Sequence, residues 1–193
     1  MYWRSAIVAA VLTLSALSGV GAYQLVRPAL DRGDAQSQGQ WQGKWEEITW
    51  PYPRDAWPPG RAFRCTTCGE GGEAVELYVR PKIGFCNCDT GVADDDEVDR
   101  VADLDLISLK FVPTADGKLV SLPDLAGRAR SYELKMPDGS DHAAVGIALN
   151  HRCDLLVAVV QGHARAADLQ HLAMDYLASH EIHHWMMASL GGH

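Results

Sequence analysis

Cysteine residues are the most concentrated source of chemistry in this sequence. Four of the five cysteines fall in two tight pairs, Cys65-Thr66-Thr67-Cys68 and Cys86-Asn87-Cys88. Closely spaced thiols either bind a metal ion as thiolates or are oxidised to disulfides. The fifth, Cys153, begins an apolar run and is expected to be a buried free thiol.

The spacing of the two pairs bears on the choice between metal and disulfide. Cys65, Cys68 and Gly69 fit one half of a zinc ribbon, whereas Cys86 and Cys88 are one residue too close for the other half. Cysteines separated by one residue rarely join each other, so disulfides between the two pairs are sterically favoured, while all three connectivities of the four cysteines stay open. A four-thiolate metal site is the alternative, and a redox-active dithiol is a third interpretation.

The C-terminal part of the chain carries a second group of candidate metal ligands. His180-Glu181-Ile182-His183-His184 matches the pattern His-Glu-x-x-His in a segment predicted to be helical. Histidines four residues apart share one helix face and can bind zinc, and the glutamate can then act as general base. This would make His180 and His184 zinc ligands and Glu181 the catalytic base of a hydrolase. Against it, Met187 and Leu190 occupy positions where the extended zinc-protease pattern has Gly and a third His.

Two other interpretations of the same segment stay open. The first is a copper site, because imidazole and thioether ligands suit that metal outside the cytoplasm. Its ligands would be His180, His183, His184, Met186 and Met187. The second is a helix without a metal, in which the histidines face solvent while Trp185 and Leu190 pack inward.

The densest run of charge is acidic and covers residues 94–100. It lacks the spacing of an EF-hand calcium loop. We predict a helix start instead, in which Asp94 is the N-cap and Glu97 is its capping-box partner. These two residues are therefore assigned a structural role.

Residues 1–26 have the pattern of an export signal. Arg4 precedes an apolar run from Ala6 to Ala22, and Val20-Gly21-Ala22 offers a cleavage site for signal peptidase. The apolar stretch also approaches the roughly 20 residues that span a bilayer, so an uncleaved membrane anchor is the other prediction. Both place the rest of the chain in the periplasm or outside the cell.

Composition defines the remainder of the chain and its partners. Residues 27–44 are polar and are predicted to be a flexible linker, and residues 45–193 are long enough for a single domain with its own core. The formal net charge of −8, without a basic cluster, argues against a nucleic-acid partner. The expected partners are the membrane, if the segment is uncleaved, and another envelope protein.

Hydrophobic periodicity predicts the elements that position these residues. Alternation over 74–80 indicates a half-buried strand, for which Pro81 and Gly84 suggest an edge position or a bulge. Residues 104–112 and 131–136 are further strand candidates. Apolar runs over 142–149 and 153–161 predict a hairpin, and a period of three to four residues begins at Ala164. We therefore predict an α+β fold with a mainly antiparallel sheet and a C-terminal amphipathic helix.

The sequence leads to three functional hypotheses. The first is an exported or membrane-anchored accessory or binding protein, held by its cysteines. The second is the zinc-dependent hydrolase, and the third is a periplasmic metal-binding protein that uses the C-terminal His and Met residues. Zinc and copper are the only cofactors that the residue types suggest.

Overall fold

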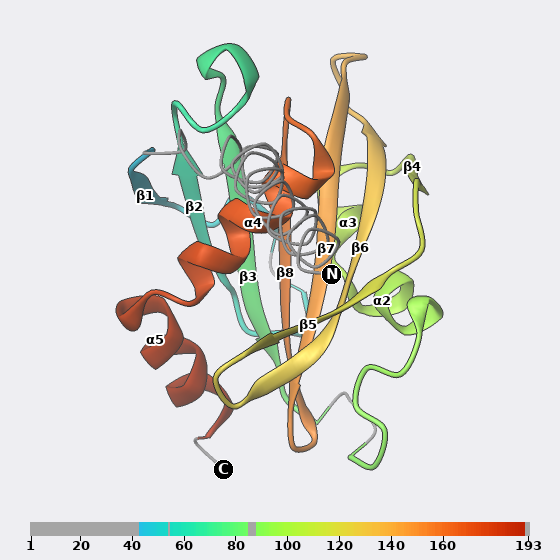
Figure 1. Ribbon diagram of the computed structural model, residues 1–193, viewed down its shortest axis with the longest axis vertical. Coiled ribbons are helices and arrows are strands. Elements are labelled where there is room, and N and C mark those ends of the chain that lie inside the picture. Colours follow the sequence, from blue (N-terminus) through green and yellow to red (C-terminus); the bar gives the residue numbers. More distant parts are fainter. Residues whose placement is uncertain (1–42, 54, 85–87, 192–193) are drawn as a thin grey trace, which may run out of the picture. The chain divides into compact units, whose positions relative to one another are not determined.

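The computed structural model describes residues 43–53, 55–84 and 88–191 (Figure 1). The strands in chain order are β1 (Trp45–Ile48), β2 (Arg61–Cys65), β3 (Val75–Lys82), β4 (Phe111–Pro113), β5 (Lys118–Leu122), β6 (Leu125–Lys135), β7 (Asp141–His151) and β8 (Asp154–Gly162). The helices are the short 3₁₀ helix η1 (Glu70–Gly72), α2 (Asp95–Val101), α3 (Leu104–Ile107), α4 (Ala166–Leu177) and α5 (His180–Leu190).

The described strands form one eight-stranded sheet in the order β1-β2-β3-β8-β7-β6-β4, with β5 also paired to β6. Every pairing is antiparallel. Strands β3, β8 and β7 make up the middle of the sheet, and the long strand β6 follows next to β7 (Figure 1). The predicted α+β class with a mainly antiparallel sheet is confirmed.

The predicted hairpin is formed by β7 and β8. Both strands are rich in apolar and β-branched residues and are buried along most of their length, as expected for interior strands with both faces covered. Arg152 and Cys153 make the turn between the paired His151 and Asp154, and Arg152 has a left-handed φ of 56°. This register fixes which side chains of the two strands share a face.

Helices α4 and α5 cover one face of the sheet. The amphipathic period beginning at Ala164 produces α4, whose buried residues are Leu169, Leu172, Ala173 and Leu177. On α5 the buried residues are Ile182, Met186 and Leu190, which recur every four residues. Both helices lie in front of the strands in Figure 1. The single predicted C-terminal helix is therefore two helices.

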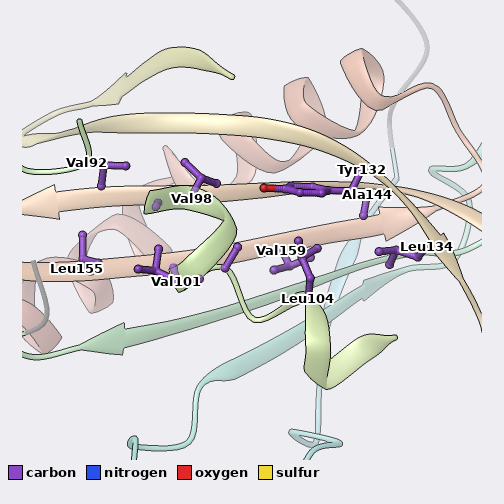
Figure 2. Close-up of a cluster of buried hydrophobic side chains, with 12 residues drawn as sticks. Val92, Val98, Val101, Leu104, Tyr132, Leu134, Ala144, Leu155 and Val159 are labelled. Carbon is purple, nitrogen blue, oxygen red and sulfur yellow. The ribbon is translucent and has the colours of Figure 1, made fainter. Parts of the chain in front are cut away.

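The opposite face is covered by α2 and α3. Figure 2 shows Val98 and Val101 of α2 and Leu104 of α3 pointing at the strands. They pack with a cluster of buried residues that includes Tyr132, Leu134, Ala144, Leu155, Val157 and Val159. On β8, Leu155, Val157 and Val159 alternate with Leu156, Ala158 and Val160. Side chains at successive strand positions point to opposite faces of the sheet, so the second set points to the α4–α5 face.

Close approach of two strands explains one glycine of the core. A Cβ on Gly127 of β6 would lie 1.9 Å from the carbonyl oxygen of Ala148 on β7. Real side chains never come that close to a backbone oxygen, so any larger residue must move one of the strands. Glycine therefore permits the spacing of β6 and β7 at this point.

Two predictions about the strands are wrong. The strand over 74–80 is the interior strand β3, with β2 on one side and β8 on the other, so the edge position, one of its two predicted alternatives, is wrong. Pro81 is tolerated because the pairing with β2 ends at Val79, which leaves β8 as its only partner strand. Residues 104–112 were expected to be a strand but begin with α3, because Leu104 turns into the core below α2.

The predicted N-terminal signal or anchor over residues 1–26 and most of the linker over 27–44 lie outside the described residues. Within the described part of the chain, no helix is both long and apolar enough to cross a membrane.

Candidate functional site

A row of polar side chains runs along one face of the interior strand β3. Glu76, Tyr78, Arg80 and Lys82 occupy alternate positions and so point to the α2–α3 face, and we call them the β3 polar row. Arg80 is only 3% exposed and Lys82 only 5%. Buried charges are tolerated only when they are paired, so their partners define the site.

Asp103, at the start of α3, is the centre of the charged half of the row. Its carboxylate accepts hydrogen bonds of 2.5 and 2.7 Å from the Arg80 guanidinium and one of 2.8 Å from Lys82 Nζ. Lys82 also donates to the carbonyl of Val101 at 2.8 Å. Asp55 lies in the stretch between β1 and β2, residues 50–60, which we call the proline-rich segment. It completes the cluster with hydrogen bonds of 2.8 and 3.0 Å from Arg80 Nη1. The two buried cations are thus compensated by the buried carboxylate of Asp103 and by the more exposed carboxylate of Asp55.

Aromatic residues of the proline-rich segment lie over the same row. Trp50, Tyr52 and Tyr78 make edge-to-face contacts with centroid distances of 5.0 to 6.1 Å. The guanidinium of Arg80 lies 5.9 Å from the Trp50 ring centroid. Burial raises the pKa of Tyr52 to about 12, so this phenol stays protonated at neutral pH. The segment packs against the domain through its aromatic side chains.

The other half of the row is organised by Glu76. Its carboxylate accepts hydrogen bonds of 2.6 and 2.9 Å from Arg64, one of 3.0 Å from Gln161 Nε2, and one from the hydroxyl of Tyr78. Burial alone would raise the pKa of Glu76, but the hydrogen bonds from Tyr78 and Arg64 outweigh it and the pKa is lowered. Glu76 is therefore ionised and holds the Gln161 amide in one orientation.

Two histidines continue this polar chain toward solvent. His142 Nδ1 is hydrogen bonded to Gln161 Oε1, and the His142 and His163 rings lie 4.2 Å apart between centroids. His163 Nδ1 in turn lies 2.5 Å from Glu73 Oε2. Within the described residues, every buried side-chain nitrogen and oxygen has a hydrogen-bond partner. The β3 polar row is therefore part of a fully hydrogen-bonded network within the domain, and this network ends in a partly exposed pair of histidines.

Sequence reasoning missed both the polar row and the histidine pair. The alternation of β3 was interpreted as polar residues facing water, whereas the proline-rich segment and α3 cover them. The histidine pair could have been predicted from the register of the hairpin. His142 precedes Ala143 and His163 follows Gly162, and these neighbours are paired in the register, so the next pair outward is His142 and His163.

The predicted cysteine chemistry takes the disulfide form. Cys65 at the end of β2 joins Cys68, with Cα atoms 5.5 Å apart, and Cys88 joins Cys153 with Cα atoms 4.4 Å apart. Pairing between Cys65–Cys68 and Cys86–Cys88 was sterically favoured, and it is wrong for these residues. Cys153 is not the free thiol that was expected, because the β7–β8 turn brings it to Cys88. The partner of Cys86 lies outside what the structure describes.

These disulfides bear directly on the metal alternative. Three of the four proposed thiolate ligands, Cys65, Cys68 and Cys88, are consumed in disulfides, so they do not form a four-thiolate site in this structure. Gly43 lies against the first disulfide, since a Cβ there would be 2.0 and 2.1 Å from the two sulfur atoms. The start of the described domain therefore packs directly on Cys65 and Cys68.

The His-Glu-x-x-His residues lie on the first turns of α5. The rings of His180 and His184 are stacked with centroids 6.3 Å apart. The Glu181 side chain is 82% exposed and lies 3.4 Å from Arg61. The described residues include no group of three or more His, Cys, Asp or Glu side chains that could hold a metal ion. The zinc-hydrolase prediction has two candidate ligands here and no third one among the described residues.

One of the proposed copper ligands, Met186, lies in the core. Met186 is completely buried beneath α5, whereas His180 and His184 are exposed. The imidazole of His183 already has a hydrogen-bonding partner, since its Nε2 lies 2.8 Å from the Pro123 carbonyl oxygen. Trp185, which was expected to pack inward, is half-buried with Arg61 5.3 Å from its ring centroid.

The acidic run begins α2. Asp94 Oδ1 accepts a hydrogen bond of 2.9 Å from the backbone N–H of Glu97, the geometry of an N-cap. The Glu97 side chain pairs with Arg100 at 2.6 Å. Asp95 accepts from the backbone of Gly117 at 2.8 Å and from Arg128, tying α2 to β6 and the loop before β5.

Two open hollows lie beside β4, the short strand at one end of the sheet order. Their volumes are about 530 and 630 Å³, and Lys110 and Lys135 line both. Leu109 beside them is 91% exposed and Val112 is also exposed. In the described part of the chain, β4 pairs only with β6. This edge offers unpaired backbone groups next to apolar side chains.

Comparison with known proteins places the chain in no family. No family model and no curated protein matches it. Among solved structures, the chain is similar to PA94 from Pseudomonas aeruginosa, a protein of unknown function. The two share 15% identity with a TM-score of 0.38, over 69% of this chain and 92% of that one.

Proposed function

We propose that this chain is an exported accessory or binding protein whose domain works on the outer side of the cytoplasmic membrane. The observation that carries the proposal is the disulfide between Cys88 and Cys153, which joins residues 65 apart in the sequence. Structural disulfides of this kind form and persist in oxidising compartments and are rare in the cytosol. The export-type pattern of residues 1–26 supports the same location.

The buried polar network has the features of a rigid scaffold for a binding surface rather than those of an exposed reactive centre. This network is buried under the proline-rich segment and fixes that segment to β3. Such satisfied networks make a domain rigid and specify one arrangement of its parts. A rigid domain tethered by residues 1–26, if these are uncleaved, would present its surface to another envelope protein.

The edge strand β4 is the surface that we assign to such a partner. An extended segment can add to a sheet edge by main-chain hydrogen bonds while its side chains enter neighbouring pockets. Exposed Leu109 and Val112 supply apolar contacts, and Lys110 supplies a cation beside them, whereas Lys135 is paired with Asp141 at 2.8 Å. The partner segment would be extended and apolar, with an acidic residue at the position that faces Lys110.

Location is tested by alkylation of intact cells. A membrane-impermeant maleimide, applied after mild reduction of whole cells or spheroplasts, is expected to label Cys88, which is exposed in the described structure. A cytoplasmic protein carrying an exposed cysteine serves as control. Labelling only after lysis, together with fully reduced cysteines in the isolated protein, contradicts the proposal.

The binding surface is tested by site-specific photocrosslinking in the same cells. A photoreactive residue at Leu109 is expected to crosslink to one extracytoplasmic protein, whereas the same residue at Leu119, which is 78% exposed on β5, does not. Purified partner should then bind the Leu109→Ser/Val112→Thr variant at least tenfold more weakly than Leu119→Ser. Equal binding by both variants would overturn the assignment of β4.

A further inference from the structure

We propose that His142 and His163 form a binding site for a divalent transition-metal ion of the copper and zinc group. This site is separate from the α5 histidines and does not depend on the function proposed above. It rests on which nitrogen of each imidazole is already occupied. A neutral imidazole binds a metal through one nitrogen while the other donates a hydrogen bond.

The tautomer of His142 follows from a chain of hydrogen bonds. Glu76 is ionised and accepts from Gln161 Nε2 at 3.0 Å, so the amide of Gln161 directs its oxygen toward His142. Since Oε1 of Gln161 only accepts, His142 Nδ1 must carry the hydrogen. The lone pair of the neutral ring is then on Nε2. Glu76 is in turn held in place by the exposed Arg64 and the buried Tyr78, which fixes this arrangement.

The tautomer of His163 follows from its carboxylate partner. Glu73 Oε2 lies 2.5 Å from His163 Nδ1, so Nδ1 donates and Nε2 keeps the lone pair of the neutral ring. A carboxylate behind a histidine is the usual second partner of a metal-bound imidazole, because it orients the ring and raises its basicity. Within the described residues, no hydrogen bond occupies Nε2 of His142 or of His163.

The two imidazole rings are neighbours at the surface of the domain. Their centroids lie 4.2 Å apart at an interplanar angle of 66°, and they lie at the solvent end of the polar chain. His163 is exposed and His142 is half-buried, so an ion can reach them from water. The carboxylate of Glu73 behind His163 makes the surroundings favourable for a cation.

The chemistry of the donors selects the metal. Imidazole nitrogen prefers copper, zinc and nickel over magnesium or calcium, and copper(II) binds most tightly in this series. The described residues hold no cluster of three or more metal-binding side chains, so the protein supplies two ligands and leaves coordination positions for water or for a group on a partner. We therefore expect moderate affinity with a ratio of one ion per chain.

Titration of the full chain, purified without a His-tag, tests this site. The background is the His180→Ala/His184→Ala variant, which removes two of the three α5 histidines as competitors; the third, His183, has its Nε2 2.8 Å from the Pro123 carbonyl oxygen. Copper(II) and zinc ions are added separately and binding is followed by calorimetry, with electron paramagnetic resonance reporting nitrogen ligands to copper. We expect one copper ion with nitrogen ligands, and at least a tenfold loss of affinity in both His142→Ala and His163→Ala.

Matched variants separate ligation from indirect effects. His171→Ala removes an exposed histidine of α4 that lies 3.4 Å from Asp175, and it should leave copper binding unchanged. Gln161→Leu keeps both ligands but removes the group that sets the tautomer of His142, so it should weaken binding less than His142→Ala does. Circular dichroism checks that each variant is folded. Absence of copper binding in the background variant, or binding that survives in His142→Ala and His163→Ala, would overturn the proposal.

Discussion

Asp103 and Arg80 form a two-bond ion pair, 2.5 and 2.7 Å long, between the start of α3 and the interior strand β3. Both residues are buried, and Lys82 shares the same carboxylate. The pair explains why a strand with two cations can lie inside the sheet. It also joins the α2–α3 layer to the strand that the proline-rich segment covers, so that three parts of the chain depend on one carboxylate.

Removing that carboxylate charge should destabilise the domain strongly. Asp103→Asn leaves Arg80 with Asp55 as its charged partner and takes the Asp103 carboxylate away from the buried Lys82. Breaking a buried ion pair by removing one partner costs about 3–5 kcal/mol in the free energy of unfolding. Urea unfolding followed by tryptophan fluorescence measures the difference. Asp105→Asn, on an exposed neighbouring position, is the control and should change stability by less than about 0.5 kcal/mol.

The long-range disulfide should contribute more stability than the short one. Cys88→Ser/Cys153→Ser opens a cross-link between residues 65 apart, and Cys65→Ser/Cys68→Ser opens one between residues 3 apart. Because a cross-link restricts the unfolded chain more when it closes a longer loop, we expect losses of about 2–4 kcal/mol for the first. Both are made with Cys86→Ser to prevent thiol exchange. A smaller loss for the first variant than for the second would contradict this ranking.

Acid should weaken the domain through its hydrogen-bonded carboxylates. The pKa of Glu76 is lowered from its ordinary value of 4.5, and that of Asp55 from 3.8. A lowered pKa in the folded state adds stability above the unfolded-state value, and this contribution is lost as pH falls through the folded-state value. Urea midpoints should therefore be flat between about pH 5 and 7 and fall below about pH 4.5.

Glu76→Gln tests which carboxylate is responsible. This variant should be less stable than the natural chain at neutral pH by about 1–2 kcal/mol, because Arg64 and Tyr78 lose a charged acceptor. Its midpoint should then change less on going to acid. Glu46→Gln, on an exposed position of β1, is the comparison. An unchanged acid slope in Glu76→Gln would assign the pH dependence to other groups.

Gly127→Ala should disturb the pairing of β6 with β7. The added methyl would lie 1.9 Å from the Ala148 carbonyl oxygen, so a backbone shift is unavoidable. Overpacking of this kind costs about 1–3 kcal/mol. Thermal unfolding measures the loss, and hydrogen exchange of the β6 and β7 amides locates it. Ala126→Ser, on the exposed neighbouring position, should behave like the natural chain.

Metal analysis decides the hydrolase prediction for α5. Protein purified without a His-tag should contain no stoichiometric zinc that depends on His180, because Glu181 faces solvent beside Arg61 and the described residues supply no third ligand. Near-stoichiometric zinc that disappears in His180→Ala would instead support the enzyme. His171→Ala is the matched control, since it also removes an exposed histidine from a helix.

Local sequence determined the elements whose signals are contained in a few neighbouring residues. The β-branched runs of 142–149 and 153–161 formed the predicted hairpin, the period from Ala164 formed α4, and Asp94 lies at an N-cap. In each case the residues that set the structure lie within one turn or one strand. The presence of disulfides was also correctly expected, because cysteine content reports on the compartment.

Tertiary structure decided the relationships between distant residues. Cys88 is bonded to Cys153 rather than to Cys65 or Cys68, because the β7–β8 turn places Cys153 next to it. The cations of β3 are buried because Asp103 and Asp55 arrive from other elements to compensate them. His142 faces His163 because strand register brings the two ends of a hairpin together. Pairing of charges, thiols and imidazoles depends on positions in space, which periodicity along the chain does not encode.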